Sequence, residues 1–351
     1  MTSIRKPIAF HPSLAKNEVG LTVRDYEGAM STLCAGCGHD SVTAALVRAF
    51  WELSVPPQDV AKLSGIGCSS KTPAYFMSGA HGFNAAHGRM PAIATGARAA
   101  NRDMVYVGIS GDGDSLSIGL GHLCHAIRRN VRMLYVIENN GVYGLTKGQF
   151  SASSDVGSKS KKGEPNEMRP IDPAIVALSL GATFVARSFS GDKEQLVPIL
   201  KAGIKHRGFA LIDVISPCVT FNDHEGSTKS YLATRKRSLP LVHTDFVPPA
   251  EEISATIPEG GVIAVRLHDG STIRFSRVAK DYDPRDPVAV TRYLQEHQAE
   301  GLVPTGLLYF DEDHPDMHQM SGTVPRALTG LGHEELCPGS AALDELMETF
   351  R

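Results

Sequence analysis

The chain has 351 residues, 42% of them hydrophobic, and carries a formal net charge of −3 at pH 7. This length is enough for one large α/β domain, alone or with a small appendage, and the near-neutral charge gives no reason to expect a nucleic-acid partner. No apolar stretch approaches the roughly 20 residues needed to cross a bilayer, and the N-terminus lacks a secretory signal, so we expect no membrane association and a cytoplasmic location.

Helical and strand-like patterns alternate from about residue 39 to residue 217. Apolar residues recur at helical spacing over residues 42–53, before the first predicted strand. Short segments that are apolar on both faces predict buried strands at residues 59–64, 104–110, 131–137, 182–187 and 209–216. The helices predicted between these strands cover residues 91–100, 116–129, 173–180 and 193–206. Buried strands that alternate with helices predict an α/β fold, in which a parallel sheet has helices on both faces.

The pattern changes beyond residue 220, where prolines at 240, 248 and 249 punctuate a linker. The segments predicted after the linker are two strands around a His-Asp-Gly turn (262–275), a helix (286–299), a strand (306–310) and a C-terminal helix. The organisation that we expect is an N-terminal arm with the first cysteines (1–38), an α/β domain (39–220), and a C-terminal linker with a small α+β region (221–351).

Two polar loops follow consecutive predicted strands. Residues 111–114 read Gly-Asp-Gly-Asp and lead into a helix; the glycines allow a tight turn, and the free N–H groups of the helix favour an anion. The next strand ends in residues 138–144, with the sequence ENNGVYG. One helix separates the loops, so both leave the carboxyl edge of the sheet, where neighbouring strands lie roughly 4.8 Å apart. Asp112 and Asn140 could therefore reach one Mg²⁺, which prefers oxygen ligands and binds substrate phosphates.

The first loop alone also fits an ordinary glycine turn between a strand and a helix. The common nucleotide-binding motifs are poorly supported, because the chain lacks G-x-x-x-x-G-K-[ST] and has no G-x-G-x-x-G directly after the first strand.

Four of the six cysteines lie in predicted loops, and the cysteines of a cytoplasmic protein are expected to be reduced. Cys34 and Cys37 form a CAGC motif before the first helix, whereas Cys68 and Cys218 follow strands and leave the same sheet edge as the polar loops. Four thiolates suit a [4Fe–4S] cluster; four separate cysteines could also bind zinc, although no second CxxC supports a paired zinc site. The remaining two are a predicted core residue and a C-terminal residue of undefined role, Cys124 and Cys337.

The GDG loop, with Asn-Asn in the next loop, resembles the thiamine-diphosphate-binding motif. Together with the cysteine pattern, it resembles the β subunits of 2-oxoacid:ferredoxin oxidoreductases, in which a CxxC pair and a third cysteine precede the motif and a fourth follows the domain. The likeness extends through GIGCSS, AHGRMPAIATGARAAN, SGDGDSLSIG, VYGLTKGQ, SPCVT and CPGSAAL. It covers most of residues 30–230 and is most like the 2-oxoglutarate type.

The resemblance implies the diphosphate-binding half of a thiamine-diphosphate fold and assigns residues to each cofactor. The implied ligands of Mg²⁺ are Asp112, Asn140 and the carbonyl of Val142. The implied ligands of a [4Fe–4S] cluster are Cys34, Cys37, Cys68 and Cys218. The implied contacts to thiamine diphosphate are Ile66, Gly67, Cys68, Ser69, His87, Gly113, Asp114, Gly144 and Leu145.

The chain also departs from the family pattern at three places. Leu33 and Ala35 stand where the family often has Trp and Pro, which is expected to alter the shielding of the cluster. Residues 151–153 read Ser-Ala-Ser in place of the commoner Ser-Pro-Thr, which leaves the geometry of this active-site loop open.

The resemblance implies oxidative decarboxylation of a 2-oxoacid, with coenzyme A as co-substrate and ferredoxin as electron acceptor. We favour 2-oxoglutarate, with pyruvate or another 2-oxoacid as the alternative. The family also implies an α subunit that supplies the pyrimidine-binding domain and an activating glutamate, in an α2β2 assembly. Two other functions stay open: a non-oxidative thiamine-diphosphate decarboxylase or synthase, and a non-catalytic, zinc-stabilised assembly module.

Two side chains are candidates for a catalytic role. Lys147, in the GLTKGQ segment, is the candidate for binding a substrate carboxylate or a coenzyme A phosphate, and a solvated loop lysine is the alternative. His87, in the AHGR segment, is expected to hydrogen-bond the diphosphate, and a purely structural histidine is the alternative.

Overall fold

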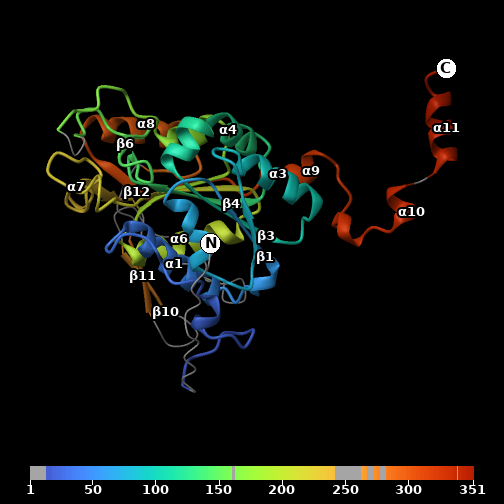
Figure 1. Ribbon diagram of the computed structural model, residues 1–351, viewed down its shortest axis with the longest axis horizontal. Helices are drawn as coiled ribbons and strands as arrows, with labels where there is room; N and C mark the ends of the chain where they lie inside the picture. Colours follow the sequence, from blue (N-terminus) through green and yellow to red (C-terminus); the bar gives the residue numbers. More distant parts are fainter. Residues whose placement is uncertain (1–12, 160–162, 242–261, 267–271, 277–281, 338) are drawn as a thin grey trace.

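A computed structural model describes residues 13–159, 163–241, 262–266, 272–276, 282–337 and 339–351 (Figure 1). Its centre is an eight-stranded sheet with the strand order β2-β1-β3-β4-β8-β7-β12-β9. The strands are β1 (Val60–Ser64), β2 (His81–Asn84), β3 (Val105–Gly111), β4 (Met133–Asn139), β7 (Phe184–Phe189), β8 (Phe209–Ile215), β9 (Ser238–Pro240) and β12 (Val303–Phe310). All neighbouring pairs are parallel except β7 and β12, which are antiparallel.

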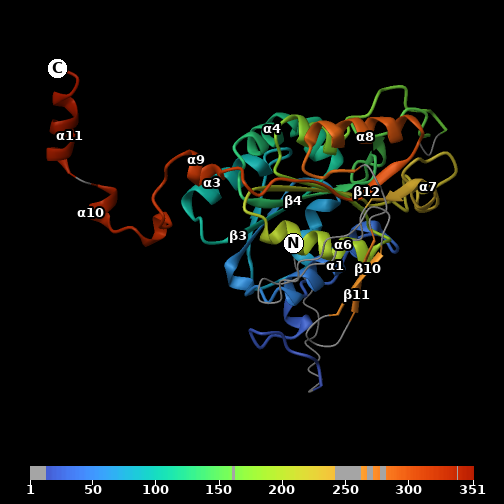
Figure 2. The same cartoon turned by 180° about the vertical axis from the view of Figure 1, so that it is seen from behind.

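Helices cover both faces of this sheet, as the sequence predicted. One face packs against α1 (Gly38–Glu52) and α6 (Lys193–Lys205). The other face packs against α3 (Met90–Ala100), α4 (Leu120–Arg128), α5 (Pro173–Ser179) and α8 (Pro287–Ala299), and Figure 2 shows the two layers from behind. The apolar side chains of each layer fill a separate buried core. The predicted α/β fold class is therefore confirmed.

The helix predicted over residues 116–129 is wrong at its start. A π-helical segment, Gly113–Ile118, precedes α4, and Gly119 separates the two. The reason is close backbone packing, because a Cβ atom added to Gly88 would lie 2.7 Å from the Cα of Gly119. Side-chain periodicity does not reveal such a contact, and π segments of this kind are frequent at functional sites.

Part of the C-terminal region joins the central sheet. Strand β12 pairs with β7, and α8 packs on the same helical layer as α5. The predicted hairpin is present as β10 (Val262–Arg266) and β11 (Thr272–Ser276), while the turn predicted between them lies outside the described residues. The domain boundary at residue 220 stays a prediction, although the sheet itself continues beyond it.

The chain ends in an extended tail. After α9 (Met317–Met320) come a short 3-10 helix (Leu328–Gly330) and the α-helices α10 (His333–Leu336) and α11 (Ser340–Glu348). Helix α11 confirms the predicted C-terminal helix. Figures 1 and 2 show that this segment leaves the body beside α3 and α9. None of the helices in the described residues has the length and apolarity that a membrane span requires.

Candidate functional site

The loops that follow β1, β3 and β4 meet at the carboxyl edge of the sheet and enclose a cavity of about 100 Å³. Its lining residues are His39, Ile66, Gly67, Cys68, Ser69, His87, Gly111, Asp112, Gly113, Asp114, Asn140, Val142, Tyr143, Gly144, Leu145 and Thr146. This set contains every predicted thiamine-diphosphate contact and all three predicted Mg²⁺ ligands. The structure thus brings these residues together, while their roles stay predictions.

The carboxylate of Asp112 is the most tightly held acid of this cavity. It is 1% exposed, and its Oδ2 accepts hydrogen bonds from the N–H of Gly141 (3.1 Å) and from the hydroxyls of Ser151 and Ser153. Its Oδ1 accepts one bond in the described structure, from the N–H of Asn140 (3.3 Å). A carboxylate offers about four lone-pair directions, so Oδ1 retains acceptor capacity for a cation.

The loop after β4 supplies the other oxygen groups. The N–H of Val142 donates to Asn140 Oδ1 (3.0 Å), and the side chain of Asn222 donates to the Asn140 carbonyl (2.7 Å). Gly141 has φ +76°, and a Cβ atom there would lie 3.0 Å from Asn222 Nδ2. The left-handed backbone therefore favours glycine at this turn. Carboxylate, amide and carbonyl oxygens are the donor set that suits Mg²⁺.

Asp114 holds the loop of His87. Its Oδ1 accepts a hydrogen bond from the N–H of Gly88 (2.7 Å) and lies 2.5 Å from His87 Nδ1, while its Oδ2 accepts one from Ser110 (2.6 Å). Since both oxygens of this buried carboxylate bind the protein itself, its geometry favours a positioning role. The imidazole of His87 remains 34% exposed, so it keeps a surface available to a ligand.

The hydroxyl of Ser69 fits an anionic ligand. Ser69 is 2% exposed, and its Oγ has no hydrogen-bond partner among the described residues. Leaving a buried hydroxyl unpaired costs about 1–3 kcal/mol, so a ligand oxygen that accepts its proton would remove this penalty. A Cβ atom on Gly111 would lie 3.1 Å from the same Oγ, and the glycine keeps the space beside the hydroxyl open. This pattern matches a cradle for phosphate oxygens.

Two buried groups at the cavity have pKa values that burial shifts strongly. Glu138 ends β4, accepts hydrogen bonds from the Thr72 hydroxyl, and lies 3.6 Å from His39 Nδ1. Burial raises the pKa of Glu138 well above its ordinary value and lowers the pKa of His39 to about 4. His39 is therefore neutral at pH 7, and its Nδ1 lies 2.6 Å from the Ser216 hydroxyl.

The four loop cysteines lie near one another. A Cβ atom on Gly144 would lie 3.3 Å from the sulfur of Cys68 and 3.8 Å from that of Cys218, so these thiols flank the cavity. Burial raises the pKa of Cys37 to about 12, and Cys218 contributes to this rise; burial also raises the pKa of Cys68, with contributions from Cys218 and Cys34. All six cysteines are free thiols.

The described residues contain no group of three or more His, Cys, Asp or Glu side chains arranged to hold a metal ion. The [4Fe–4S] ligand set and the zinc alternative therefore stay predictions. Two of the four thiols lie at the candidate cavity for thiamine diphosphate. Cys68 lines this cavity, and Cys218 lies beside it.

Lys147 lies outside this cavity. Its side chain is exposed, and its backbone has φ +80°, a left-handed conformation that is uncommon for a residue other than glycine. It occupies the turn between β5 (Val142–Tyr143) and β6 (Gln149–Phe150), where its N–H donates to the Gly144 carbonyl at 3.2 Å. The predicted role in binding a substrate stays untested.

A buried polar chain behind Asp112 was not predicted. The Ser153 hydroxyl lies 2.7 Å from Asp112 and 2.8 Å from Asn139 Oδ1, and Asn139 in turn donates to Asp213 (2.9 Å). Arg187 then joins Asp213 (2.8 Å) to Asp172 (2.6 Å). Asp112, Asn139 and Ser153 lie in segments that the sequence had marked, whereas Asp213, Arg187 and Asp172 gave no sequence signal.

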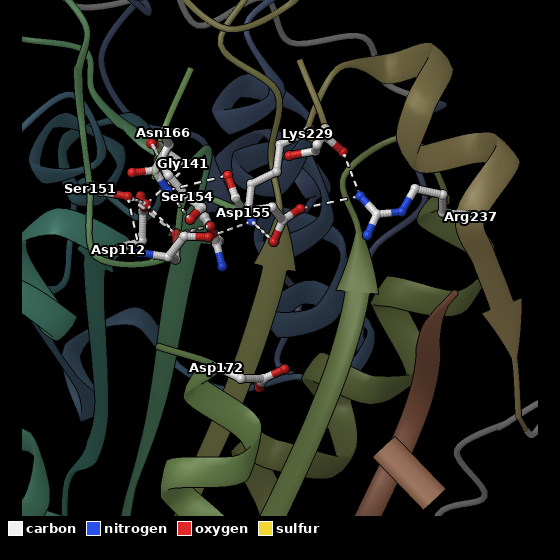
Figure 3. A network of polar contacts seen from close by, with 12 residues as sticks. Asp112, Gly141, Ser151, Ser154, Asp155, Asn166, Asp172, Lys229 and Arg237 are labelled. Atoms are coloured by element: carbon white, nitrogen blue, oxygen red, sulfur yellow. Dashed lines mark hydrogen bonds and ion pairs between the residues drawn. The ribbon is translucent and has the colours of Figure 1, made fainter. Parts of the chain in front are cut away.

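A second branch fixes the backbone of the serine loop. Lys229 donates to the Ser153 carbonyl (2.7 Å) and lies 3.6 Å from Asp155, which also pairs with Arg237 at 3.2 Å (Figure 3). Burial opposes ionisation of Asp155, but the two cations outweigh it and lower the pKa of this carboxyl. Three charged groups thus anchor the loop that orients Asp112.

Comparisons with known proteins show to which proteins the chain is similar. Residues 65–214 match the family described as thiamine pyrophosphate enzyme, C-terminal TPP binding domain. A 2-oxoacid:ferredoxin oxidoreductase subunit beta from Sulfolobus sp is 46% identical over 191 residues, which cover 54% of this chain and 63% of the relative. The 2-oxoglutarate synthase subunit KorB of Methanocaldococcus jannaschii is 38% identical over 189 residues, which cover 54% of this chain and 69% of the relative.

A solved structure is similar over most of its length. It is the 2-oxoglutarate:ferredoxin oxidoreductase from Magnetococcus marinus with 2-oxoglutarate, coenzyme A and succinyl-CoA bound. The TM-score is 0.70 at 31% sequence identity, and the match covers 88% of this chain and 91% of that one. By contrast, the matched segment spans less than two thirds of several curated relatives, such as 63% of the Sulfolobus chain.

Proposed function

Because the chain belongs to the β-subunit family of 2-oxoacid:ferredoxin oxidoreductases, we propose that it forms the diphosphate-binding half of an enzyme that oxidatively decarboxylates a 2-oxoacid. The products are the acyl-coenzyme A and carbon dioxide, and the electrons pass to ferredoxin. The residues that would bind the cofactors line the cavity at the carboxyl edge or lie beside it.

The observation that carries the proposal is one cavity that joins oxygen donors, an unpaired buried hydroxyl and a cysteine thiol. Asp112, Asn140 and the Val142 carbonyl would hold Mg²⁺, and the Ser69 hydroxyl would donate to a diphosphate oxygen. Asp114 keeps His87 beside the same cavity. When bound, thiamine diphosphate supplies the electron sink that decarboxylation requires.

The four loop cysteines are proposed to hold a [4Fe–4S] cluster. Its role would be one-electron transfer to ferredoxin, which explains why the thiols border the cofactor cavity. Cys68 belongs to both proposed sites, because it lines the cavity and its sulfur lies on the same side of Gly144 as the sulfur of Cys218.

The active site is proposed to need an α subunit, in an α2β2 assembly. A thiamine enzyme requires a carboxylate that activates the aminopyrimidine, and among the described residues the acids at this cavity are already engaged. Asp112 and Asp114 each bind several protein donors, and Glu138 is bonded to Thr72. A partner chain that covers the carboxyl edge would supply the missing glutamate and the pyrimidine-binding domain.

We favour 2-oxoglutarate as the substrate, with pyruvate as the main alternative. The support is the naming of relatives, including the 2-oxoglutarate oxidoreductase subunit KorB of Mycobacterium tuberculosis, which is 42% identical over 221 residues. Lys147 and Thr146 lie on the turn beside the cavity mouth, where a substrate carboxylate or a coenzyme A phosphate would approach.

The cluster assignment is tested by iron and sulfide analysis of the protein purified without oxygen. The wild type should show broad absorption near roughly 400 nm, and Cys218→Ser should lose it together with the iron. Cys124→Ser is the matched control, because this half-buried thiol lies on α4 and should leave the iron content unchanged. One zinc per chain and no iron would contradict the assignment.

The activity is tested by anaerobic assay of the complex copurified with its α subunit. We expect ferredoxin reduction that depends on coenzyme A and is fastest with 2-oxoglutarate, when compared with pyruvate and a branched 2-oxoacid. The isolated chain should be inactive. Full decarboxylation by the chain alone would contradict the need for a partner. Decarboxylation of the 2-oxoacid by the complex without reduction of ferredoxin would favour a non-oxidative enzyme.

A further inference from the structure

Two segments that are far apart in the sequence lie against each other at the carboxyl edge of the sheet. The first, residues 140–148, carries Asn140 and Val142 and is called the ligand loop. The second, residues 218–229, begins with Cys218 after β8 and is called the cysteine segment. The proposed Mg²⁺ site and the proposed cluster site therefore share a boundary inside one chain.

Glycines of the ligand loop stand at three contacts with the cysteine segment. They are Gly141, Gly144 and Gly148. An added Cβ atom would lie 3.0 Å from Asn222 Nδ2 at the first, 3.8 Å from the Cys218 sulfur at the second, and 3.0 Å from the Phe221 Cβ at the third. Side chains at the first and third positions would push the two segments apart. The glycines therefore allow the backbone of the ligand loop to approach the cysteine segment closely.

Asn222 joins the two segments by hydrogen bonds. Its N–H donates to the carbonyl of Cys218 (2.8 Å), and its side-chain amide donates to the carbonyl of Asn140 (2.7 Å). The residue is 2% exposed, and its Oδ1 has no hydrogen-bond partner among the described residues. The amide that donates to Asn140 is thus the polar group that orients this side chain. One residue connects the backbone of a proposed cluster ligand to the backbone of a proposed Mg²⁺ ligand.

Asn140 is held at three of its atoms. Its N–H donates to Asp112 (3.3 Å), its Oδ1 accepts a hydrogen bond from the N–H of Val142 (3.0 Å), and its carbonyl accepts one from Asn222. The first two partners belong to the proposed Mg²⁺ site itself. The bond from Asn222 is therefore the contact through which the cysteine segment can act on the position of Asn140.

The far end of the cysteine segment supports the other Mg²⁺ ligand. A Cβ atom on Gly141 would lie 3.1 Å from Cδ of Lys229, whose ammonium group donates to the Ser153 carbonyl (2.7 Å). The Ser153 hydroxyl in turn donates to Asp112 (2.7 Å). The cysteine segment thus contacts the supports of both Asn140 and Asp112.

We propose that Asn222 is a positioning residue that couples the two cofactor sites, so that a cluster bound through Cys218 strengthens the binding of thiamine diphosphate with Mg²⁺. This coupling rests on the proposed function, which takes Cys218 and Asn140 as ligands. A bond from the Cys218 sulfur to iron would order the turn that ends at Asn222, and the donated hydrogen bond would then fix the Asn140 carbonyl. A ligand that binds to a loop already ordered loses less conformational freedom, so its affinity is higher.

The test compares the affinity for thiamine diphosphate with Mg²⁺ in two forms of the complex copurified with its α subunit. One form carries the cluster, and the other has lost it to an iron chelator that is removed before calorimetric titration. The wild type should bind about tenfold more tightly with the cluster, a ratio typical of coupling between two sites. Asn222→Leu keeps the approximate shape of the side chain without its amide donor, so both forms should bind about as weakly as the cluster-free wild type.

Asn17→Leu is the matched control. The Asn17 amide also donates to a backbone carbonyl, that of Trp51 (3.0 Å), at the end of α1 opposite to Cys37, so this variant should keep the wild-type ratio. Equal affinities in the two wild-type forms, or an unchanged ratio in Asn222→Leu, would overturn the coupling and leave the proposed function intact. A wild-type complex that binds no iron or no thiamine diphosphate would overturn both.

Hydrogen exchange of the wild type tests the same coupling without a substitution. The amides of Asn140, Gly141 and Val142 all donate within the proposed Mg²⁺ site. Without thiamine diphosphate, they should exchange about tenfold more slowly in the cluster-loaded complex than in the cluster-free one, because the ordered cysteine segment holds their loop. Strand β7 is the internal control and should exchange equally in both forms. Equal exchange at residues 140–142 would contradict the coupling.

Discussion

The two edges of the sheet are formed by the same strands but have opposite characters. At the carboxyl edge, buried carboxylates and amides are held by many hydrogen bonds, and Asp112 alone accepts four. The amino edge, where β7 begins, carries an apolar groove lined by Phe184, Ala202, Leu307 and Phe310. Lys205 and Arg207 are exposed at its border, and the imidazole of His206 in its lining is neutral at pH 7. The difference shows that the polar groups are concentrated where a ligand is expected, whereas the opposite edge offers mainly apolar contact area.

This division has an energetic basis. Each buried polar group costs free energy unless it is hydrogen-bonded, so the carboxyl edge must satisfy its acids through the serine loop and its lysine and arginine supports. The apolar lining of the amino-edge groove needs no such support, because burial of apolar surface is non-directional. Substitutions at the carboxyl edge should therefore leave buried polar groups without hydrogen bonds, whereas substitutions in the amino-edge groove should mainly change apolar contact.

Loss of the Asp112 carboxylate should have the largest effect. Asp112→Ala should weaken binding of thiamine diphosphate with Mg²⁺ by more than about 100-fold, since loss of even an outer-shell group typically costs 10–100-fold. Calorimetric titration measures this affinity. Asp103→Ala, an exposed aspartate near the amino edge, is the control and should bind normally. Retention of the cofactor by Asp112→Ala would contradict the assignment of the Mg²⁺ site.

Removal of the Arg187 charge should destabilise the fold strongly. Asp172 and Asp213 outweigh the effect of burial and raise the pKa of Arg187, so the guanidinium is charged. Arg187→Met leaves two carboxylates unpaired and should lower the free energy of unfolding by about 3–5 kcal/mol. Urea denaturation measures the change. The exposed pair of Arg285 and Glu312 is the comparison, and Arg285→Met should stay within about 1 kcal/mol.

The amino edge should show a pH effect through His206. Burial, with a contribution from Arg132, lowers its pKa from the ordinary 6.5 to about 4. Between these values the unfolded chain binds a proton that the folded chain excludes, so this group's contribution falls by roughly 3 kcal/mol as pH drops from 6.5 to 4. Stability measured against pH should be flatter for His206→Gln. An identical slope in both proteins would contradict burial of a neutral imidazole.

Alanine substitutions at two glycines near the carboxyl edge should change the stability of the protein in opposite directions. A Cβ atom on Gly113 would lie 2.5 Å from the ring of Tyr143, so Gly113→Ala should destabilise the protein by about 1–3 kcal/mol. Gly121, on α4, has no atom within 4 Å of an added Cβ, so Gly121→Ala should stabilise it by roughly 0.5–1 kcal/mol. Thermal denaturation of both variants measures the difference. Equal effects would contradict close packing at the turn after β3.

The main strands of the fold were predictable because both of their faces are buried. Strands β1, β3, β4, β7 and β8 agree with the predicted segments to within two residues at each end. Strand β2 was missed because its four residues, HGFN, are polar or exposed and lie at the sheet edge. Strand β9 was missed for a similar reason, since it contains three residues and ends in proline.

The site was predictable only where its residues sit at strand ends. The positions of Asp112 and Asn140 follow from strand order, so their approach could be expected. The support of Asp112 by Ser153 could not, because it joins residues 41 apart in sequence through a loop without regular structure. The Arg187–Asp213 pair depends on the register of two strands that are not marked by any local motif.

The π-helical segment after β3 has a consequence for how the chain can aim its side chains. Each residue of a helix turns the side-chain direction by about 100°, and the wider π turn changes that phase before α4 begins. Asp114 can thus face His87 while Leu123 and Ile127 still face the core. Deleting one residue from this segment would turn either Asp114 away from His87 or the apolar side chains of α4 away from the core. The length of the segment is therefore as constrained as its composition.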